Sequence, residues 1–238
     1  MTVEYGHWDE VWKSQKYISD YMLRWYGYLE NVSRGLLPAK RDILEVGSGS
    51  GAGIAIFARD GHRSSGLDIS KVAIERSSSR YREVKFFYND LFAMPFEDNR
   101  FDLVFNSGVI EHFLYPKNID ALRAMERVLR PGGRLIVSVP NKLCWWYTIG
   151  KKILIKIKRW PYGFEDGYSP ALLKRYIGEV NNLRLNRIFG MQALPMLALP
   201  NFELIPLPLR KAVAKIENIL PLKKYYSFAI IAECTKIK

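Results

Sequence analysis

The chain has 238 residues, of which 48% are apolar and 25% charged, values typical of a globular protein with one large core. Its two cysteines, Cys144 and Cys234, fit no metal-binding or redox spacing, which favours a reducing compartment. The N-terminus carries acidic residues without an apolar run, and no stretch reaches the ~20 apolar residues of a membrane span. These features argue against a signal peptide and a spanning helix, so we expect a cytoplasmic protein.

The net charge of +12 is distributed unevenly along the chain. Residues 1–140 hold 19 Lys and Arg against 18 Asp and Glu, a net of +1, whereas residues 141–238 hold 17 against 6, a net of +11. A basic surface attracts nucleic acid, lipid headgroups or phosphorylated substrates. Charge alone does not choose among these partners.

Residues 8–34 have the pattern of a helix whose aromatic side chains are spread around all its faces. Such a helix is too apolar to be fully solvated, so part of it should pack against the rest of the protein. Gly35 and Pro38 end the pattern. We therefore expect residues 1–36 to form an N-terminal helical cap.

Strand and helix signals alternate between residues 42 and 139. The expected strands cover 42–46, 64–67, 84–88, 101–105 and 134–139, and the expected helices cover 52–59, 71–81 and 118–129. This alternation with short linkers predicts a doubly wound, Rossmann-like α/β fold in which helices cover both faces of a parallel sheet.

The pattern changes after Pro140. Residues 142–160 contain six basic residues and no acidic one, beside four aromatic side chains. Further on, the sequence predicts a helix from Ser169 to about Val180, an irregular apolar segment at 194–209 and a short helix at 209–220, with strands at 184–189 and 226–233.

The stretch Ile43–Gly51 reads ILEVGSGSG. An apolar run ends in an acid, glycine follows at every second position, and a helical pattern begins at Ala52. This order predicts a buried strand, a tight turn and a helix N-terminus, where bare N–H groups and the helix dipole favour an anionic or nucleotide ligand. Glycine at Gly47, Gly49 and Gly51 would let the backbone approach that ligand closely.

Acidic side chains follow the next strands at the points where each one ends. Asp68 comes 21 positions after Gly47, where a carboxylate can accept both hydroxyls of a ribose. Asp90 could accept from an adenine amino group with Leu91 beside the ring, and Glu111 and His112 follow the fourth strand. Ligands of open parallel sheets bind beyond the carboxyl ends of the strands, so we expect these residues to share one site.

Five segments together make the chain resemble the class I S-adenosylmethionine-dependent methyltransferases, and in particular the small-molecule enzymes of the quinone pathway. They are LEVGSGSG, LDIS at Leu67–Ser70, NDL at Asn89–Leu91, FDLVFNSGVIEH at Phe101–His112 and LRPGGRLIVSVPN at Leu129–Asn141, and they span residues 41–141.

The resemblance implies a single methyltransferase domain over residues 1–238, with a seven-stranded, mostly parallel sheet whose last strand is antiparallel. It implies S-adenosyl-L-methionine as the cofactor and a cofactor-binding core at 41–141. Glycines of the loop would line the methionine part, Glu45 would orient the loop and the cofactor's amino group, and the other matched positions would hold the ribose, the adenine and the sulfonium end. These positions are Gly47, Gly49 and Gly51 for methionine, Asp68 with Ile69 for ribose, Asp90 and Leu91 for adenine, and Asn106 or Ser107 beneath the sulfonium.

Two other readings of the same core are possible. Gly47, Gly49 and Ala52 also fit the dinucleotide fingerprint of nicotinamide dehydrogenases, but Glu45 and Asp90 favour the methyltransferase, and no second mononucleotide half is evident. A non-catalytic cofactor-binding protein would have the same loop and acids, and only turnover separates it from an enzyme.

His112 is the candidate catalytic residue. Methyl transfer relies mainly on alignment and desolvation, and a base is needed only when the acceptor must lose a proton. An imidazole titrates near neutral pH and suits that task, although His112 could equally line the cofactor pocket or cap a turn. The Glu111–His112 pair also resembles quinone-pathway O-methyltransferases in which an upstream Glu helps to hold a divalent metal. That upstream position is Gly108 here, so we expect no metal site.

The residues that would bind the methyl acceptor are expected in the basic C-terminal part of the chain. The segment Asn106–Val109 lacks the Asn/Asp-Pro-Pro-aromatic motif of base amino methylation, and Cys144 lacks the Pro-Cys setting of carbon-5 methylation, so a nucleic-acid partner is not expected. Methylation of an RNA ribose or a protein stays an alternative.

Residues 142–160 resemble an interfacial helix with lysines on anionic lipid, since Ile149, Ile153 and Ile157 fall on one face, although an internally packed lid fits the same pattern. We expect lids at 142–168 and 191–222, and an apolar or lipid-linked small-molecule acceptor that is O- or C-methylated, with the protein cytoplasmic or peripherally bound to a membrane.

Overall fold

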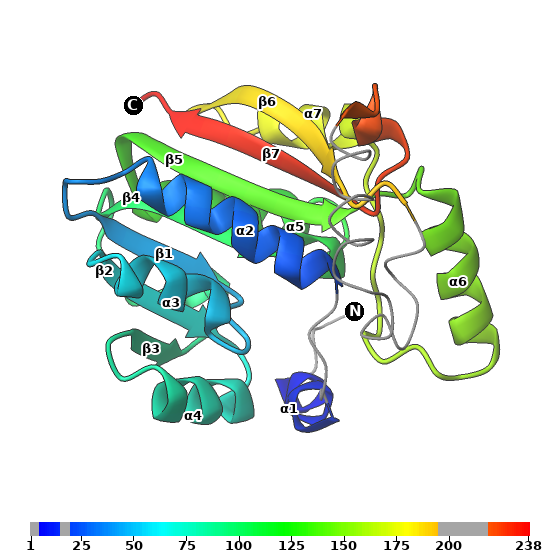
Figure 1. The fold of residues 1–238 in the computed structure, drawn as a ribbon, viewed down its shortest axis with the longest axis horizontal. Coiled ribbons are helices and arrows are strands. Elements are labelled where there is room, and N and C mark those ends of the chain that lie inside the picture. Colours follow the sequence, from blue (N-terminus) through cyan, green and yellow to red (C-terminus); the bar gives the residue numbers. More distant parts are fainter. Residues whose placement is uncertain (1–4, 15–19, 195–218) are drawn as a thin grey trace.

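The computed structural model describes residues 5–14, 20–194 and 219–238 (Figure 1). Its helices are α1 (Tyr5–Ser14), α2 (Asp20–Arg34), α3 (Ala52–Arg59), α4 (Lys71–Arg80), α5 (Lys117–Val128), α6 (Trp145–Lys156) and α7 (Pro170–Gly178), with short 3-10 turns η1 (Leu91–Ala93), η2 (Ile110–His112) and η5 (Lys223–Tyr225). Its strands are β1 (Asp42–Val46), β2 (Arg63–Asp68), β3 (Lys85–Tyr88), β4 (Phe101–Ser107), β5 (Leu129–Pro140), β6 (Leu183–Met191) and β7 (Ala229–Lys236).

The strands form one seven-stranded sheet in the order β3-β2-β1-β4-β5-β7-β6. Strands β1 to β5 pair in parallel, whereas β7 runs antiparallel to both of its neighbours, β5 and β6. The strand order reverses between β1 and β4, which makes this pair the switch point where open α/β sheets bind ligands. The predicted doubly wound α/β sheet with an antiparallel last strand is therefore confirmed.

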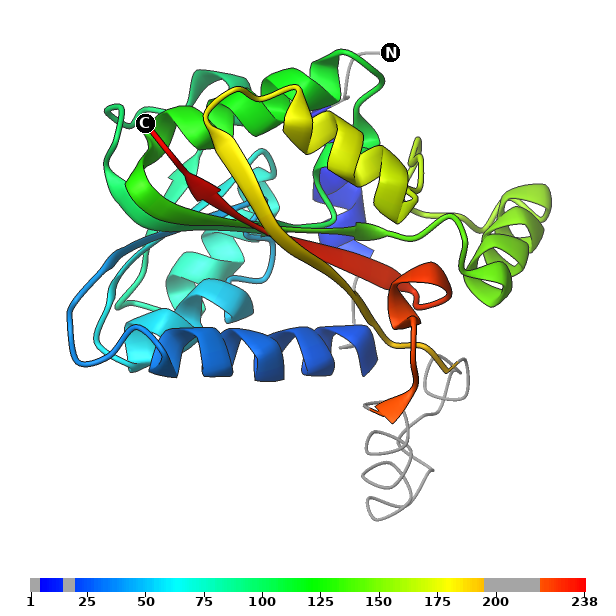
Figure 2. The same ribbon diagram turned by 90° about the horizontal axis from the view of Figure 1, so that it is seen from above.

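Alternation along each strand divides the core into two layers. On β1, Leu44 and Val46 join the apolar cluster that contains α5 and α7, while Ile43 joins the cluster that contains α2 and α3. Viewed from above, the sheet lies between these two layers of helices (Figure 2). Period-2 side chains buried on both faces are what a parallel sheet covered by helices requires.

Several element boundaries differ from the sequence expectation. The aromatic segment 8–34 gives two helices, α1 and α2, and α2 lies flat on the sheet with Trp25 and Leu29 buried, so it belongs to a core layer and only α1 is a cap. The LRPGG stretch lies inside β5, where the pairing with β4 shifts register between Phe101 and Leu103. The irregular segment expected at 194–209 and nearly all of the helix expected at 209–220 lie outside the described residues.

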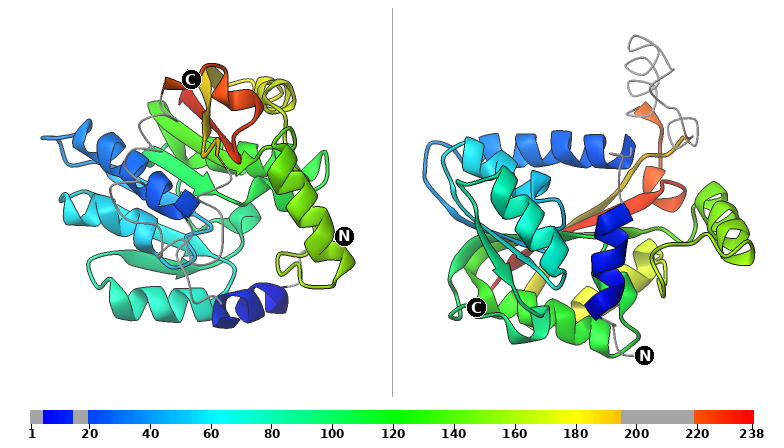
Figure 3. Two further views of the ribbon diagram at one scale, coloured as in Figure 1. Left: turned by 45° about the vertical axis from the view of Figure 1, so that its right-hand side comes forward. Right: turned by 90° about the horizontal axis from the view of Figure 1, so that it is seen from below.

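Two helices stand at the carboxyl-end edge of the sheet. Helix α1 packs beside α4 below that edge, and α6 projects away from the body of the protein (Figures 1 and 3). Within the described ranges, no helix combines the length and the apolar character that crossing a membrane requires. The carboxyl ends of β1, β2 and β4 are thus flanked by two separate helices.

Candidate active site

The glycine loop after β1 turns back on β2 through backbone hydrogen bonds. The N–H groups of Gly47 and Ser48 both donate to the carbonyl oxygen of Leu67, at 2.8 and 3.0 Å. Gly47, Gly49 and Gly51 have φ of 69°, 48° and 73°, in the left-handed region that favours glycine.

A side chain at any of these glycines would also strike the protein itself. A Cβ on Gly47 would lie 2.4 Å from Val109, one on Gly49 2.1 Å from the Trp12 ring, and one on Gly51 2.7 Å from Phe86. Protein packing therefore requires glycine at these three positions, in addition to any approach of the backbone to a ligand. Gly51 lines neither of the two cavities described below.

Glu45 joins the loop to the helix that follows it. The carboxylate oxygen Oε2 accepts a hydrogen bond of 2.9 Å from the N–H of Ile54 in the first turn of α3, and a Cβ on Gly53 would lie 2.5 Å from Oε1. Burial raises the pKa of Glu45 well above its usual range. Its position fits the expected role in orienting the loop.

Asp68 at the end of β2 bridges the glycine loop and α4. Its oxygens accept from the N–H of Gly49 at 2.7 Å and from the N–H of Ser70 at 2.8 Å. Burial raises the pKa of Asp68 to about 6 in spite of these hydrogen bonds. The backbone N–H of Ile69 also donates to this carboxylate, so one of its four lone pairs remains for a ligand.

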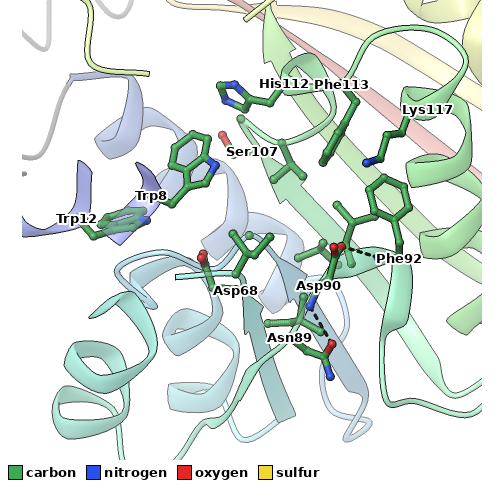
Figure 4. A pocket seen from close by; sticks show the side chains of 17 residues that line it. Trp8, Trp12, Asp68, Asn89, Asp90, Phe92, Ser107, His112, Phe113 and Lys117 are labelled. Carbon is green, nitrogen blue, oxygen red and sulfur yellow. Dashed lines mark hydrogen bonds between the residues drawn. The ribbon is translucent and has the colours of Figure 1, made fainter. Parts of the chain in front are cut away.

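A cavity of about 210 Å³ lies over these strand ends (Figure 4). Asp90 caps η1 by accepting from the N–H of Phe92 at 2.9 Å, and Leu91 and Ile69 supply apolar wall. The cavity therefore brings together the expected residues Gly47, Asp68, Ile69, Asp90, Leu91, Ser107 and His112.

Asn106, like Gly51, is an expected site residue that lies outside both cavities. It is fully buried, its side-chain amide donates to the sulfur of Met125 at 3.2 Å, and it lines neither cavity. Alternation along β4 turns the next residue, Ser107, toward the cavities instead, where its hydroxyl is 2.7 Å from that of Tyr21. Of the pair Asn106 and Ser107, only Ser107 lies at the site.

Helix α1 closes the cavity from outside, which the sequence did not indicate. Asp9 accepts hydrogen bonds from the Ser70 hydroxyl at 2.6 Å and the Val72 N–H at 3.1 Å, so it caps α4. The ring of Trp8 meets the ring of His112 edge to face, with centroids 4.8 Å apart. Trp8 and Trp12 thereby become part of the cavity wall (Figure 4).

A second cavity of about 600 Å³ adjoins the first. Its wall is rich in aromatic side chains from α1, α2, α6 and the segments around Trp160 and Phe228. The two cavities share six lining residues, which are Trp8, Trp12, Gly47, Ser107, Gly108 and His112. A molecule in one cavity would thus meet a molecule in the other at this common wall.

His112 lies at the common wall with a fixed tautomer. A ring nitrogen, Nδ1, is 2.6 Å from the carbonyl oxygen of Phe164. A carbonyl can only accept, so Nδ1 carries the hydrogen and Nε2 of the neutral ring keeps a free lone pair. Burial lowers the pKa of His112, which keeps the ring neutral near pH 7.

Glu165, from the loop after α6, is a site residue that sequence reasoning missed. Lys151 on α6 donates to its carboxylate at 2.9 Å, and the Tyr147 hydroxyl donates to the same oxygen. One ligand atom each from Glu111, His112 and Glu165 lie within 4.8 Å of one another, a grouping that could hold a metal ion. The Lys151 ammonium already neutralises Glu165 in this arrangement. No local motif surrounds Glu165, so no sequence signal could have found it.

Comparisons with known proteins agree with this geometry. Residues 44–137 match the family model described as "Methyltransferase domain". A protein of Mycolicibacterium smegmatis named as a probable S-adenosylmethionine-dependent methyltransferase is 36% identical over 105 residues, covering 44% of this chain and 40% of that protein. The ubiquinone biosynthesis O-methyltransferase of Alkalilimnicola ehrlichii is 28% identical over 186 residues, covering 74% of this chain and 70% of the relative.

Solved structures show the same fold. Magnesium protoporphyrin IX methyltransferase from Synechocystis PCC 6803, with bound SAH, superposes with a TM-score of 0.63 at 17% identity, covering 98% of this chain and 93% of that one. The chain spans about 40% of the length of the first curated relatives that it matches.

The seven-stranded sheet shares the fold of this solved methyltransferase. Residues 44–137 match a methyltransferase domain and relatives named as S-adenosylmethionine-dependent methyltransferases, so the resemblance inferred from the sequence is confirmed.

Proposed function

We propose that this protein is an S-adenosylmethionine-dependent methyltransferase whose acceptor is an apolar or lipid-linked small molecule. The observation that carries the proposal is the common wall, where His112 and Ser107 separate a cavity with strand-end carboxylates from a larger aromatic one. The cofactor's adenosine end would occupy the first cavity, and the acceptor would occupy the second.

The residues of the smaller cavity fit the cofactor. Asp68 would accept from a ribose hydroxyl and Asp90 from the adenine amino group, with Ile69 and Leu91 against the ring. The bound cofactor supplies a sulfonium methyl group that is already electrophilic. The protein therefore has to bind the cofactor, align the acceptor with it and exclude water. Helix α1, with Trp8 and Trp12, covers the wall that the two cavities share.

His112 would remove the acceptor's proton when the methylated atom carries one. Its Nε2 lone pair is available because Nδ1 donates to Phe164, and a lowered pKa keeps the ring in its accepting form. The acceptor's apolar character is inferred from the aromatic wall of the second cavity. The names of relatives that act on ubiquinone precursors and on phthiotriol dimycocerosates point the same way.

Calorimetry with S-adenosylhomocysteine tests the cofactor site. We expect one bound molecule per chain, with binding lost in Asp68→Ala and kept in Asp120→Ala, an exposed acid on the outer face of α5. Consumption of S-adenosylmethionine with a lipid extract then separates an enzyme from a non-catalytic binding protein. Absent binding by the unaltered protein would reject the proposal.

We further propose that α6 holds the protein on an anionic membrane surface. The α6 helix buries none of its side chains, and Trp145, Ile149 and Ile153 are 64%, 52% and 55% exposed. Lys152 and Lys156 accompany these residues and the helix carries no acid, whereas Lys151 is paired with Glu165. Apolar side chains at headgroup depth with lysines on lipid phosphate match this composition.

Flotation with vesicles containing phosphatidylglycerol tests the membrane proposal. The unaltered protein should float with these vesicles and remain behind with phosphatidylcholine vesicles. The double variant Ile149→Ser, Ile153→Ser should stay at the bottom of the gradient, without the vesicles, while still binding S-adenosylhomocysteine. Equal flotation of variant and unaltered protein would contradict a role for α6.

A further inference from the structure

Three hydroxyl groups meet where the start of α2 packs on the carboxyl ends of β4 and β5. Ser107 ends β4, and Ser138 lies opposite it in the register of β5. The Tyr21 hydroxyl, from the first turn of α2, lies 2.7 Å from Oγ of Ser107 and 2.6 Å from Oγ of Ser138. All three residues of this hydroxyl trio line the larger cavity, and Ser107 lines the smaller one as well (Figure 4).

The hydroxyl trio has more hydrogens than its own hydrogen bonds use. Each of the three hydroxyls carries one, because a tyrosine with the ordinary pKa of 10.0 is neutral at pH 7 and burial raises the pKa of Tyr21 further, to about 12. The two hydrogen bonds inside the trio use two of these hydrogens. Within residues 5–14, 20–194 and 219–238, the three hydroxyls have no further hydrogen-bond partner. One hydrogen is therefore left to donate, whichever way the hydroxyls point.

Ser107 can present this hydrogen at the wall that the two cavities share. When Ser138 donates to Tyr21 and Tyr21 donates to Ser107, the hydrogen of Ser107 is the one left free. Ser107 is also partly exposed, whereas Ser138 is 1% exposed. Hydrogen bonds in a chain polarise one another, so the two bonds behind Ser107 strengthen it as a donor. A ligand that excludes water from this wall without accepting the hydrogen would leave a polar group unpaired, which is unfavourable.

The surroundings of the hydroxyl trio belong to the aromatic side of the larger cavity. The Tyr21 ring meets the Phe228 ring edge to face, with centroids 5.1 Å apart. Phe228 also contacts Trp146 and Tyr147, two aromatic residues of α6. In the sheet, β4 separates β5 from β1, the strand that leads into the glycine loop (Figure 1). Since neighbouring strands lie about 4.8 Å apart, Ser138 lies about 10 Å to the side of that strand.

We propose that the hydroxyl trio binds an oxygen atom of the methyl acceptor, a carbonyl or hydroxyl oxygen that accepts a hydrogen bond from Ser107. This inference rests on the proposed methyltransferase function and adds the chemical class of the acceptor, an apolar molecule with an oxygen at the end that meets the cofactor. Aromatic walls bind an apolar body in many orientations, and a few placed polar groups decide which end faces inward. The trio supplies such a group at the common wall.

A pair of probes that differ in one group tests the inference without the natural acceptor. 4-Hexylacetophenone has a C=O group where 1-hexyl-4-isopropenylbenzene has a C=CH2 group of similar shape. In the presence of S-adenosylhomocysteine, quenching of tryptophan fluorescence should follow the binding of both, because Trp8, Trp12 and Trp25 line the cavity. The ketone should bind about five- to tenfold more tightly, as expected for one well-placed hydrogen bond.

The direction of this difference is itself informative. Without a donor in the cavity, the ketone would lose the hydration of its oxygen and gain nothing in return, so it would bind no better than the alkene. Equal or weaker binding of the ketone would overturn the inference.

Variants assign the preference to the hydroxyl trio. Ser107→Ala should bring the ratio of the two dissociation constants to about one, because the hydrogen at the common wall is removed. Ser64→Ala changes a buried serine of β2 that lines neither cavity, and it should keep the ratio. Tyr21→Phe should keep part of the ratio, because Ser107 retains its hydrogen but loses the hydroxyl that orients it. An unchanged ratio in Ser107→Ala would assign the preference to another group and overturn the inference.

The same variant decides whether the trio binds the cofactor's carboxylate instead. 5′-Methylthioadenosine has the adenosine and sulfur of the cofactor without its amino-acid part. Any change of affinity in Ser107→Ala should be the same for 5′-methylthioadenosine and S-adenosylhomocysteine. A loss confined to S-adenosylhomocysteine would assign the trio to the cofactor's carboxylate and overturn the inference.

The outcomes remain separable from those of the proposed function. If S-adenosylhomocysteine does not bind to the unaltered protein, the methyltransferase proposal fails. If it binds but the ketone is not preferred, only the role of the hydroxyl trio and the acceptor's oxygen fail.

Discussion

Helices α5 and α6 are both 12 residues long and both follow a strand, yet they relate to the protein in opposite ways. Helix α5 buries six side chains against the sheet, among them Ile119, Leu122 and Met125, whereas α6 buries none. Apolar residues on α5 therefore stabilise the fold, while Trp145, Ile149 and Ile153 on α6 are exposed and available to something outside it. A helical apolar stripe therefore does not by itself reveal what covers it.

The largest expected effect is the difference in stability between the same substitution, isoleucine to alanine, made in each helix. Ile119→Ala should lower the free energy of unfolding by about 2–5 kcal/mol, because it opens a cavity in the core. Ile153→Ala should change it by less than about 0.5 kcal/mol, because that side chain is 55% exposed. Urea unfolding measures both values, and similar losses would show that α6 is packed more tightly than the structure has it.

The next effect is the change of the free energy of unfolding with pH that the buried Asp68 causes. Asp68 has a pKa of about 6 in the folded protein against 3.8 for an unperturbed aspartate, so the folded protein binds this proton more tightly than the unfolded chain. Its contribution to stability is present below pH 4 and is lost as the pH rises through 6, by about 3 kcal/mol in total.

Urea unfolding between pH 4 and 7 measures this loss. Asp68→Asn should make stability less dependent on pH in that window, whatever its effect at a single pH. Asp42→Asn is the matched control, because Arg63 lowers the pKa of Asp42 and its effect should appear only at lower pH. An unchanged slope in Asp68→Asn would contradict the shifted pKa.

A smaller effect, on ligand affinity, distinguishes backbone strain in the glycine loop from the role of α1 in closing the cavity. Gly49→Ala and Gly61→Ala both place alanine at positive φ, which costs about 1–2 kcal/mol. Only at Gly49 does the new Cβ meet the Trp12 ring, whereas nothing lies within 4 Å of a Cβ at Gly61. Gly49→Ala should therefore also displace α1.

Calorimetry and fluorescence read out that difference. In Gly49→Ala we expect affinity for S-adenosylhomocysteine to fall by about tenfold or more, equivalent to about 1.4 kcal/mol, with a red shift of the tryptophan emission. Gly61→Ala should keep both signals. A loss of affinity in both variants would assign it to general destabilisation.

The smallest effect tests the charge on α6. Lys156→Gln should weaken binding to phosphatidylglycerol vesicles by about 1 kcal/mol at low salt, since each lysine near an anionic surface contributes that much. Lys85→Gln removes another exposed lysine, from β3 at the opposite edge of the sheet, and should leave vesicle binding unchanged. Equal losses in both variants would indicate attraction to net charge alone.

The sequence by itself determined the sheet and the strand-end residues that line the smaller cavity. The order of short apolar runs, glycines and strand-end acids is local information, because each signal needs only a few neighbouring residues. Parallel strands then bring their carboxyl ends to one edge, so the strand pattern alone places Asp68, Asp90 and His112 together, as the cavity confirms.

The larger cavity and the residues around His112 were decided only by tertiary structure. Glu165 reaches Glu111 and His112 through a loop whose path no local pattern reveals, and Trp8 and Trp12 arrive on a helix that Asp9 holds against α4. Asn106 and Ser107 are neighbours in sequence, but the pleat of β4 sends one into the core and the other to the cavities. Such contacts join residues far apart in the chain, and only packing brings them within reach.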